Sequence, residues 1–362
     1  QARRGLVGRG TAVADFHLRV RVNGDVAVLQ GIAKELLERE ARAPGSVLDR
    51  QFIELHTDGF EQYARSLRGV SWDEIVARGG VPHQELVRTA DVLARSQRCI
   101  TCWGMGITQH RNAVANIQEI VNLHLLRGQI GKRGAGLCPV RGHSNVQGDR
   151  TVGITEKPSA AFLDALEKEF GFAPPRNHGL DTVETVHAMH EGRVKVFVGM
   201  GGNFLQSAPD TEYTDEALRR CRLTVHVWIK PNRAHLVCGE QALILPCLGR
   251  SERDVQAGSE QFVTTENSMA IVQRSRGVLN PASPHLLSEP AIVARLARAT
   301  LGGRSVVDWE GMLGDYDWIR DAIARVVPGF EGYNARVRSP GGFLLPKAAP
   351  DPGFKTATGK LE

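Results

Sequence analysis

Hydrophobic and polar positions recur along this chain with two different periods, which predict where its strands and helices lie. Over residues 12–22, apolar and polar side chains alternate one by one, as in a half-buried strand. Between Val26 and Glu38, apolar residues recur every three or four positions and predict an amphipathic helix. The same spacing, with capping and stop signals, predicts further helices over residues 51–67 (broken near 58–59), from 71 onwards, and over 82–96, 112–127, 159–171, 182–191, 214–220, 288–300 and 309–327.

Two short apolar segments end in glycine turns of the same kind. Residues 98–103 lead into Gly104-Met105-Gly106, and residues 194–198 lead into Gly199-Met200-Gly201. A helix follows each turn, and a helix N-terminus that faces the end of a strand is suited to bind an anion. The repetition predicts two related α/β units that present similar turns to one ligand. The alternative is a chance recurrence in a chain with 39 glycines.

The remaining apolar runs predict strands over residues 223–229, 242–246, 261–265 and 270–274. Residues 242–246 are apolar throughout and end in a proline, which predicts a buried strand. Residues 328–353 are rich in glycine and proline and are predicted to wrap around the surface.

The segment between the two glycine turns, residues 134–150, is dense in glycine and polar side chains. It contains Arg141, His143 and Asn145, and it is much longer than the connections of two to six residues that are usual between elements. We interpret it as a functional loop, in which the planar fork of Arg141 is suited to bind a carboxylate or phosphate. An ordinary long surface loop is the alternative.

Composition narrows the class of protein. The 362 residues carry a net charge of +5 and are 42% hydrophobic, which indicates a globular chain of two or three domains or one large α/β body. The charge suits a small anionic ligand, whereas the lack of a basic run disfavours nucleic acid. No apolar run reaches about 18 residues, so no membrane span is expected.

The 6 cysteines are too few and too scattered for a disulfide scaffold and fit a reducing cytoplasm. Cys99 and Cys102 have the C-x-x-C spacing. They lie in a predicted strand, where alternation puts them on opposite faces. No second cysteine pair or histidine pair completes a metal site, so we expect both to be small buried side chains.

These motifs closely resemble the large subunit of molybdenum formate dehydrogenases, within the molybdopterin oxidoreductases. The resemblance covers essentially the whole chain and rests on 104–109, 122–123, 131, 134–136, 139–142, 145–148, 201–203, 245–246 and 354–359. It implies two Rossmann-like three-layer α/β domains of the formate dehydrogenase/DMSO reductase type, of which this chain holds the central part of a longer protein. The implied domains are 1–140, incomplete at its N-terminus, 141–353, and 354–362 as the start of a further C-terminal dinucleotide-binding domain.

The resemblance also implies a cofactor. It consists of two molybdopterin guanine dinucleotides around one molybdenum or tungsten, with one dinucleotide arm on each domain. The implied cofactor-binding residues are Gly104, Met105, Gly106, Thr108, Gln109, His110, Gly142, Asn145, Gly201, Gly202, Asn203, His226, Asn232 and Arg233. The protein ligand to the metal and the cysteines of a 4Fe–4S cluster are expected upstream of this chain, so no metal ligand is assigned within it.

The implied activity is two-electron oxidation of formate or a similar small anion, with the electrons leaving through the upstream cluster to an acceptor protein. Arg141 matches the arginine beside the metal, and His143 stands where formate dehydrogenases commonly have glutamine. A histidine there could relay a proton near neutral pH or hydrogen-bond the pterin. A non-catalytic member of the family is the first alternative. A nicotinamide dehydrogenase ranks last, because the turn at Gly104 lacks the third glycine of that motif.

Overall fold

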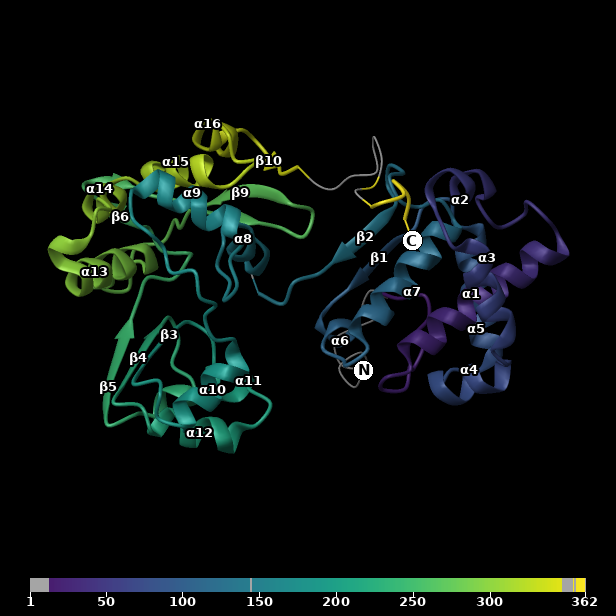
Figure 1. The fold of residues 1–362 in the computed structure, drawn as a ribbon, viewed down its shortest axis with the longest axis horizontal. Helices are drawn as coiled ribbons and strands as arrows, with labels where there is room; N and C mark the ends of the chain where they lie inside the picture. The colour runs from purple at the N-terminus through teal and green to yellow at the C-terminus, as the bar shows by residue number, and fades with distance from the viewer. Residues whose placement is uncertain (1–12, 144, 347–353, 355, 362) are drawn as a thin grey trace, which may run out of the picture. The chain divides into compact units, whose positions relative to one another are not determined.

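The computed structural model describes residues 13–143, 145–346, 354 and 356–361 (Figure 1). Contacts divide the chain into two units, one formed by residues 1–142 with 346–362 and the other by residues 143–345. Each unit is a mixture of helices and parallel strands, so the predicted α/β class is confirmed. The domain limits predicted from the sequence, 1–140, 141–353 and 354–362, stay a prediction.

The first unit is built around the predicted helix that begins after Gly24. Its apolar side faces the core, where Ala33, Leu36, Leu67, Ile75 and Leu86 are buried. Ser71 caps one of the surrounding helices by accepting a hydrogen bond from the backbone N–H of Glu74, as its sequence predicts. The helices are α1 (Asp25–Arg42), α2 (Arg50–His56), α3 (Phe60–Gly69), α4 (Trp72–Gly79), α5 (His83–Arg95), α6 (Met105–Thr108) and α7 (Ala113–Leu126).

Two strands of the first unit, β1 (Ile100–Trp103) and β2 (Gly136–Pro139), pair in parallel. Helix α7 connects them, so β1, α7 and β2 form a βαβ unit (Figure 1). The prediction that residues 134–150 form one loop is therefore wrong, because the segment contains β2 and later a helix. Glycine and proline are uncommon in strands, so the sequence of β2 does not predict one. The strand forms because it pairs with β1, which is distant in the sequence.

A second expectation for this unit is also wrong. Residues 13–22 do not form a strand, although their pattern alternates; residue 12 lies outside the described residues. Val13 and Val22 are 97% and 88% exposed, and the segment is held instead by Leu18, which packs on the helical core, and by Arg21, whose backbone N–H donates to Gly79. Alternation alone does not make a strand when no neighbouring strand pairs with it.

In the second unit, three parallel strands stand in the order β3 (Val196–Met200), β4 (Leu223–Trp228) and β5 (Gln241–Pro246). Buried side chains such as Met189, Phe197 and Leu218 join the sheet to its helices. Strand β5 was predicted to be buried, but all six of its residues are exposed, and it stands at one edge of this sheet. The helices around the sheet are α10 (Thr182–His190), α11 (Phe204–Ser207), α12 (Thr211–Arg219) and the 3-10 helix η2 (Arg233–Leu236).

The rest of the second unit packs around a three-stranded antiparallel sheet in the order β10-β9-β8. Phe330, Tyr333, Val337 and Phe343 are buried in its core. Residues 328–353 were predicted to wrap around the surface, but those between 330 and 345 contribute buried side chains to this core. Residues 347–353 lie outside the described residues. The strands are β6 (Val255–Gln256), β7 (Ser259–Glu260), β8 (Val263–Glu266), β9 (Ile271–Ser275) and β10 (Phe343–Leu344), and the helices are α8 (Val146–Thr151), α9 (Ala160–Phe170), α13 (Glu289–Leu301), η3 (Gly302–Arg304), α14 (Trp309–Gly314), α15 (Tyr316–Val326) and α16 (Tyr333–Arg338).

No helix in the described part of the chain is long and apolar enough to span a membrane.

Candidate functional site

Gly104 joins β1 to the single-turn helix α6. The segment formed by this turn, α6 and the two residues after it contains six of the predicted cofactor residues. They are Gly104, Met105, Gly106, Thr108, Gln109 and His110. The turn is braced from below by Asn116 of α7, which is fully buried and donates a 2.9 Å hydrogen bond to the carbonyl of Ile107. A ring nitrogen of His110 lies 2.6 Å from the carbonyl of Gly106. The sequence did not single out Asn116, whose only signal is a polar side chain on the apolar side of a helix.

The end of β2 lies beside this turn. The backbone N–H of Val140 donates to Trp103 at 2.7 Å, which continues the pairing of the two strands to their carboxyl ends. A Cβ atom on Gly142 would come within 2.9 Å of the methyl carbon of Met105, so a side chain at this position would press on the turn. The structure thus brings Gly142 to the first glycine turn, and the exposed Arg141 precedes it. In α/β proteins, ligands bind at this edge, beyond the carboxyl ends of parallel strands.

The second glycine turn begins at Gly201, because Gly199 and Met200 belong to β3, and it follows the carboxyl end of that strand. Gly201 and Gly202 adopt φ angles of +71° and +70°, and a Cβ atom on either would meet no atom of the described residues within 4 Å. Asn203 then caps α11. The side chain of Asn232, at the end of the neighbouring strand β4, donates a 2.7 Å hydrogen bond to the carbonyl of Gly202. This turn therefore combines a backbone that favours glycine with open space above it, which suits close approach of a ligand.

Beneath this turn lies a buried pair of histidines, His226 of β4 and His235 of η2, with ring centroids 5.2 Å apart. The His235 ring accepts the backbone N–H of Asn232 at 2.9 Å and so helps to hold the brace. His226 is only 4% exposed, and its Nε2 atom has no hydrogen-bond partner among the described residues. Burial, and then the neighbouring His235, lower the pKa of His226, which favours a neutral ring. Arg233, by contrast, is exposed.

One predicted residue of the former loop, Asn145, makes its contacts away from both glycine turns. Asn145 has a left-handed backbone (φ +67°), and its side chain accepts the N–H of Glu266 and donates to Asp149, both at 2.9 Å. These contacts attach α8 to the hairpin β8–β9 within the second unit, rather than to the turn at Gly201. His143 is exposed. The predicted roles of Asn145, His143 and the other site residues stay predictions.

The same strand, glycine turn and single-turn helix thus occur once in each unit. The sequence profile described as molybdopterin oxidoreductase matches residues 4–234. The chain belongs to the molybdopterin oxidoreductase family.

Curated relatives agree with the assignment. An uncharacterized oxidoreductase of Mycobacterium tuberculosis is 53% identical over 357 residues, which is 98% of this chain and 46% of that protein. Formate dehydrogenase H of Escherichia coli is 26% identical over 222 residues, covering 59% of this chain and 30% of the enzyme. The fold is similar to that of acetylene hydratase from Pelobacter acetylenicus, with a TM-score of 0.63 at 17% identity over 96% of this chain and 49% of that one. The chain spans about half the length of the relatives that it matches over nearly all of its residues.

Membership of this family implies a molybdopterin cofactor with molybdenum, and the second glycine turn fits such a group. The space around the Cβ positions of Gly201 and Gly202 leaves the backbone there open to close approach, and the exposed Arg233 after β4 adds positive charge for a phosphate. Among the described residues, no group of three or more His, Cys, Asp or Glu side chains could hold a metal ion. We therefore assign no metal ligand to them.

Proposed function

We propose that this chain is the central part of a molybdenum- or tungsten-dependent oxidoreductase that binds two molybdopterin guanine dinucleotides and oxidises formate or a similar small anion. The observation that carries the proposal is the matched pair of turns, at the carboxyl ends of β1 and β3. Two similar turns are what a cofactor with two similar arms requires. The likeness to formate dehydrogenase H supports a formate-sized substrate.

In this proposal each turn contacts one dinucleotide arm through its backbone. Neither turn is held by its own short helix alone, because each is braced by a buried or half-buried asparagine from a neighbouring element. Asn116 supports the first turn and Asn232 supports the second. They are therefore positioning residues, which keep the turns in place before a ligand arrives.

Arg141 is proposed to bind the substrate anion. Its guanidinium can form two parallel hydrogen bonds with a carboxylate, which fixes the orientation of a molecule as small as formate. His143 follows two positions later and is proposed to accept or hold the proton that the oxidation releases. When bound, the cofactor supplies the two-electron redox chemistry, and the chain binds and orients the substrate.

The substrate role is tested by replacing Arg141 with alanine and with lysine in the protein expressed with its natural flanking sequence. We expect both variants to keep their metal, and formate-dependent reduction of an artificial electron acceptor to fall at least 100-fold with alanine, the order expected for loss of a substrate-orienting contact. Lysine keeps the charge but not the fork, so it should recover little of the activity.

Arg150 provides the matched control, because it lies on α8 and is ion-paired to Glu156 at 3.2 Å. Arg150→Ala should leave the activity unchanged. Equal activities of the Arg141 and Arg150 variants would refute the assigned role of Arg141.

A further inference from the structure

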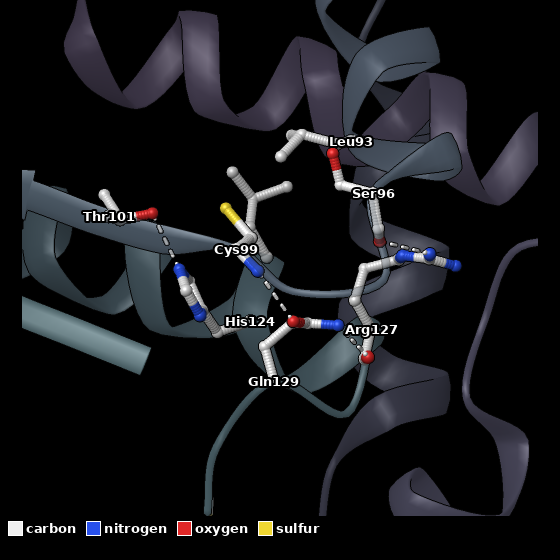
Figure 2. Close-up of a pocket in the computed structure, with 8 residues that line it drawn as sticks. Leu93, Ser96, Cys99, Thr101, His124, Arg127 and Gln129 are labelled. Atoms are coloured by element: carbon white, nitrogen blue, oxygen red, sulfur yellow. Dashed lines mark hydrogen bonds between the residues drawn. The ribbon is translucent and has the colours of Figure 1, made fainter. Parts of the chain in front are cut away.

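The two cysteines of the C-x-x-C motif, Cys99 and Cys102, are not placed to form a disulfide with each other. Cys99 and Cys102 are three residues apart in extended backbone, which separates their Cα atoms by roughly 10 Å. They also point to opposite faces of β1, as its alternating burial indicates. Cys99 lies on the side of α7, where it lines a small cavity with Thr101, His124 and Arg127 (Figure 2). A bond between these two sulfurs would require β1 to unravel.

The partner that the fold supplies for Cys102 is Cys138. The register of the parallel strands puts Cys102 of β1 opposite Cys138 of β2, two positions along from Ile100 and Gly136. Residues opposite each other in adjacent strands share a face of the sheet, so both thiols lie on the side away from α7. Cys102 is exposed and Cys138 is half-buried, and both are thiols in this structure. A reagent in solution can therefore reach the pair.

The spacing of the strands permits a bond between these two residues. Neighbouring strands lie about 4.7–4.9 Å apart, inside the range of about 4.4–6.8 Å between Cα atoms that a disulfide spans. The ideal Cβ separation, about 3.8 Å, is shorter than the strand spacing, so the two strands must lean together slightly. A disulfide formed under such strain is more readily reduced than a structural one. The geometry thus favours a reversible bond over a permanent one.

We propose that Cys102 and Cys138 form a reversible disulfide across β1 and β2. In this reaction the two thiols lose two protons and two electrons as the S–S bond forms. A low-molecular-weight disulfide, such as oxidised glutathione, accepts them and is cleaved to two thiols. The new bond lies just before the ends of the strands, where β1 enters the Gly104 turn and β2 leads to Arg141. It therefore stiffens both segments, whether or not the proposed function holds.

The test equilibrates the purified protein in glutathione buffers of increasing oxidising strength, blocks the remaining thiols, and maps disulfides by mass spectrometry without reduction. We expect a peptide that links Cys102 to Cys138, with 2 of the 6 thiols lost and restored by reduction. Hydrogen exchange should slow in residues 104–109 and 140–142 of the oxidised protein. Exchange that does not change in these segments would contradict the stiffening.

Serine variants identify the pair, because serine replaces the sulfur with little change in size. Cys102→Ser and Cys138→Ser should each abolish the linked peptide, whereas the control Cys99→Ser should leave it intact. The proposal is overturned if Cys102 is found bonded to Cys99. It is also overturned if Cys102 and Cys138 each bind glutathione without becoming linked to one another in the most oxidising buffer.

Discussion

Replacing Glu40 with glutamine should destabilise the first unit strongly, because this carboxylate is both buried and fully engaged. Glu40 lies near the end of α1 and is 1% exposed. One oxygen accepts hydrogen bonds from the backbone of Gly45 and from Arg50, and the other accepts from the backbone of Val47 and Leu48. The side chain thus fixes the segment between α1 and α2.

The size of the effect follows from the pKa of this group. Burial alone would raise the pKa of Glu40, but the backbone N–H groups and Arg50 outweigh it and lower the pKa from 4.5 to about 2. At about 1.4 kcal/mol per pH unit, the charged form adds about 3 kcal/mol to stability. In glutamine, the amide nitrogen must face one of the two pairs of donors, so two charge-assisted bonds are lost at about 1.5–3 kcal/mol each. We therefore expect Glu40→Gln to cost about 3 kcal/mol at neutral pH.

The assay is hydrogen exchange of peptides from α1 and α2 in increasing urea, which reports on the first unit separately. Because the folded pKa is depressed, the stabilisation is fully present above about pH 4.5 and is lost as the pH falls toward 2. The wild type should lose stability in that window, and Glu40→Gln should lose less. The control is Glu38→Gln on the same helix, whose partly exposed pair with Lys34 at 3.3 Å should be worth under about 1 kcal/mol. Equal stabilities of the two variants would refute the reasoning.

Two further predictions concern the glycine turns. Asn116→Ala removes the hydrogen bond from this buried side chain to the part-buried carbonyl of Ile107, so it should cost about 1–3 kcal/mol and speed hydrogen exchange in α6. Gly202→Ala should cost only about 1–2 kcal/mol by denaturant unfolding, because its φ of +70° strains an alanine but nothing lies within 4 Å. Gly342→Ala, at a φ of +71°, should cost clearly more, because its Cβ would collide with the carbonyl of Val272; equal costs would contradict this explanation.

Much of the local structure follows from the sequence. The helix from Asp25 and the hairpin around residues 266–270 are confirmed because their hydrophobic periods and turn residues are local signals. The sequence predicted one helix over residues 309–327, whereas the structure has two, α14 and α15. Asp315, with an extended backbone, ends the first and caps the second. Both strands before the glycine turns are confirmed, but the single-turn helices α6 and α11 that follow them were not predicted, and Gly199 and Met200 belong to β3 rather than to the second turn.

What could not be predicted depends on contacts between distant residues. Strand β2 exists because β1 pairs with it, and Cys138 becomes the neighbour of Cys102 only through that register. The exposure of β5 depends on which elements pack against it, which its apolar sequence does not reveal. Neither Asn116, which braces the first turn, nor His235, which holds Asn232, forms a recognisable motif, because the role of a buried polar residue depends on a partner that is distant in sequence.

The most direct test of the central claim is the content of metal and guanine nucleotide in the protein purified with its natural flanking sequence. Molybdenum and tungsten are measured by elemental analysis, and guanosine monophosphate is measured after acid hydrolysis of the bound cofactor. We predict one metal ion and two guanine nucleotides per protein chain. Protein without metal or guanine nucleotide, made in cells that load a control molybdoenzyme, would contradict the proposal and favour a non-catalytic member of the family.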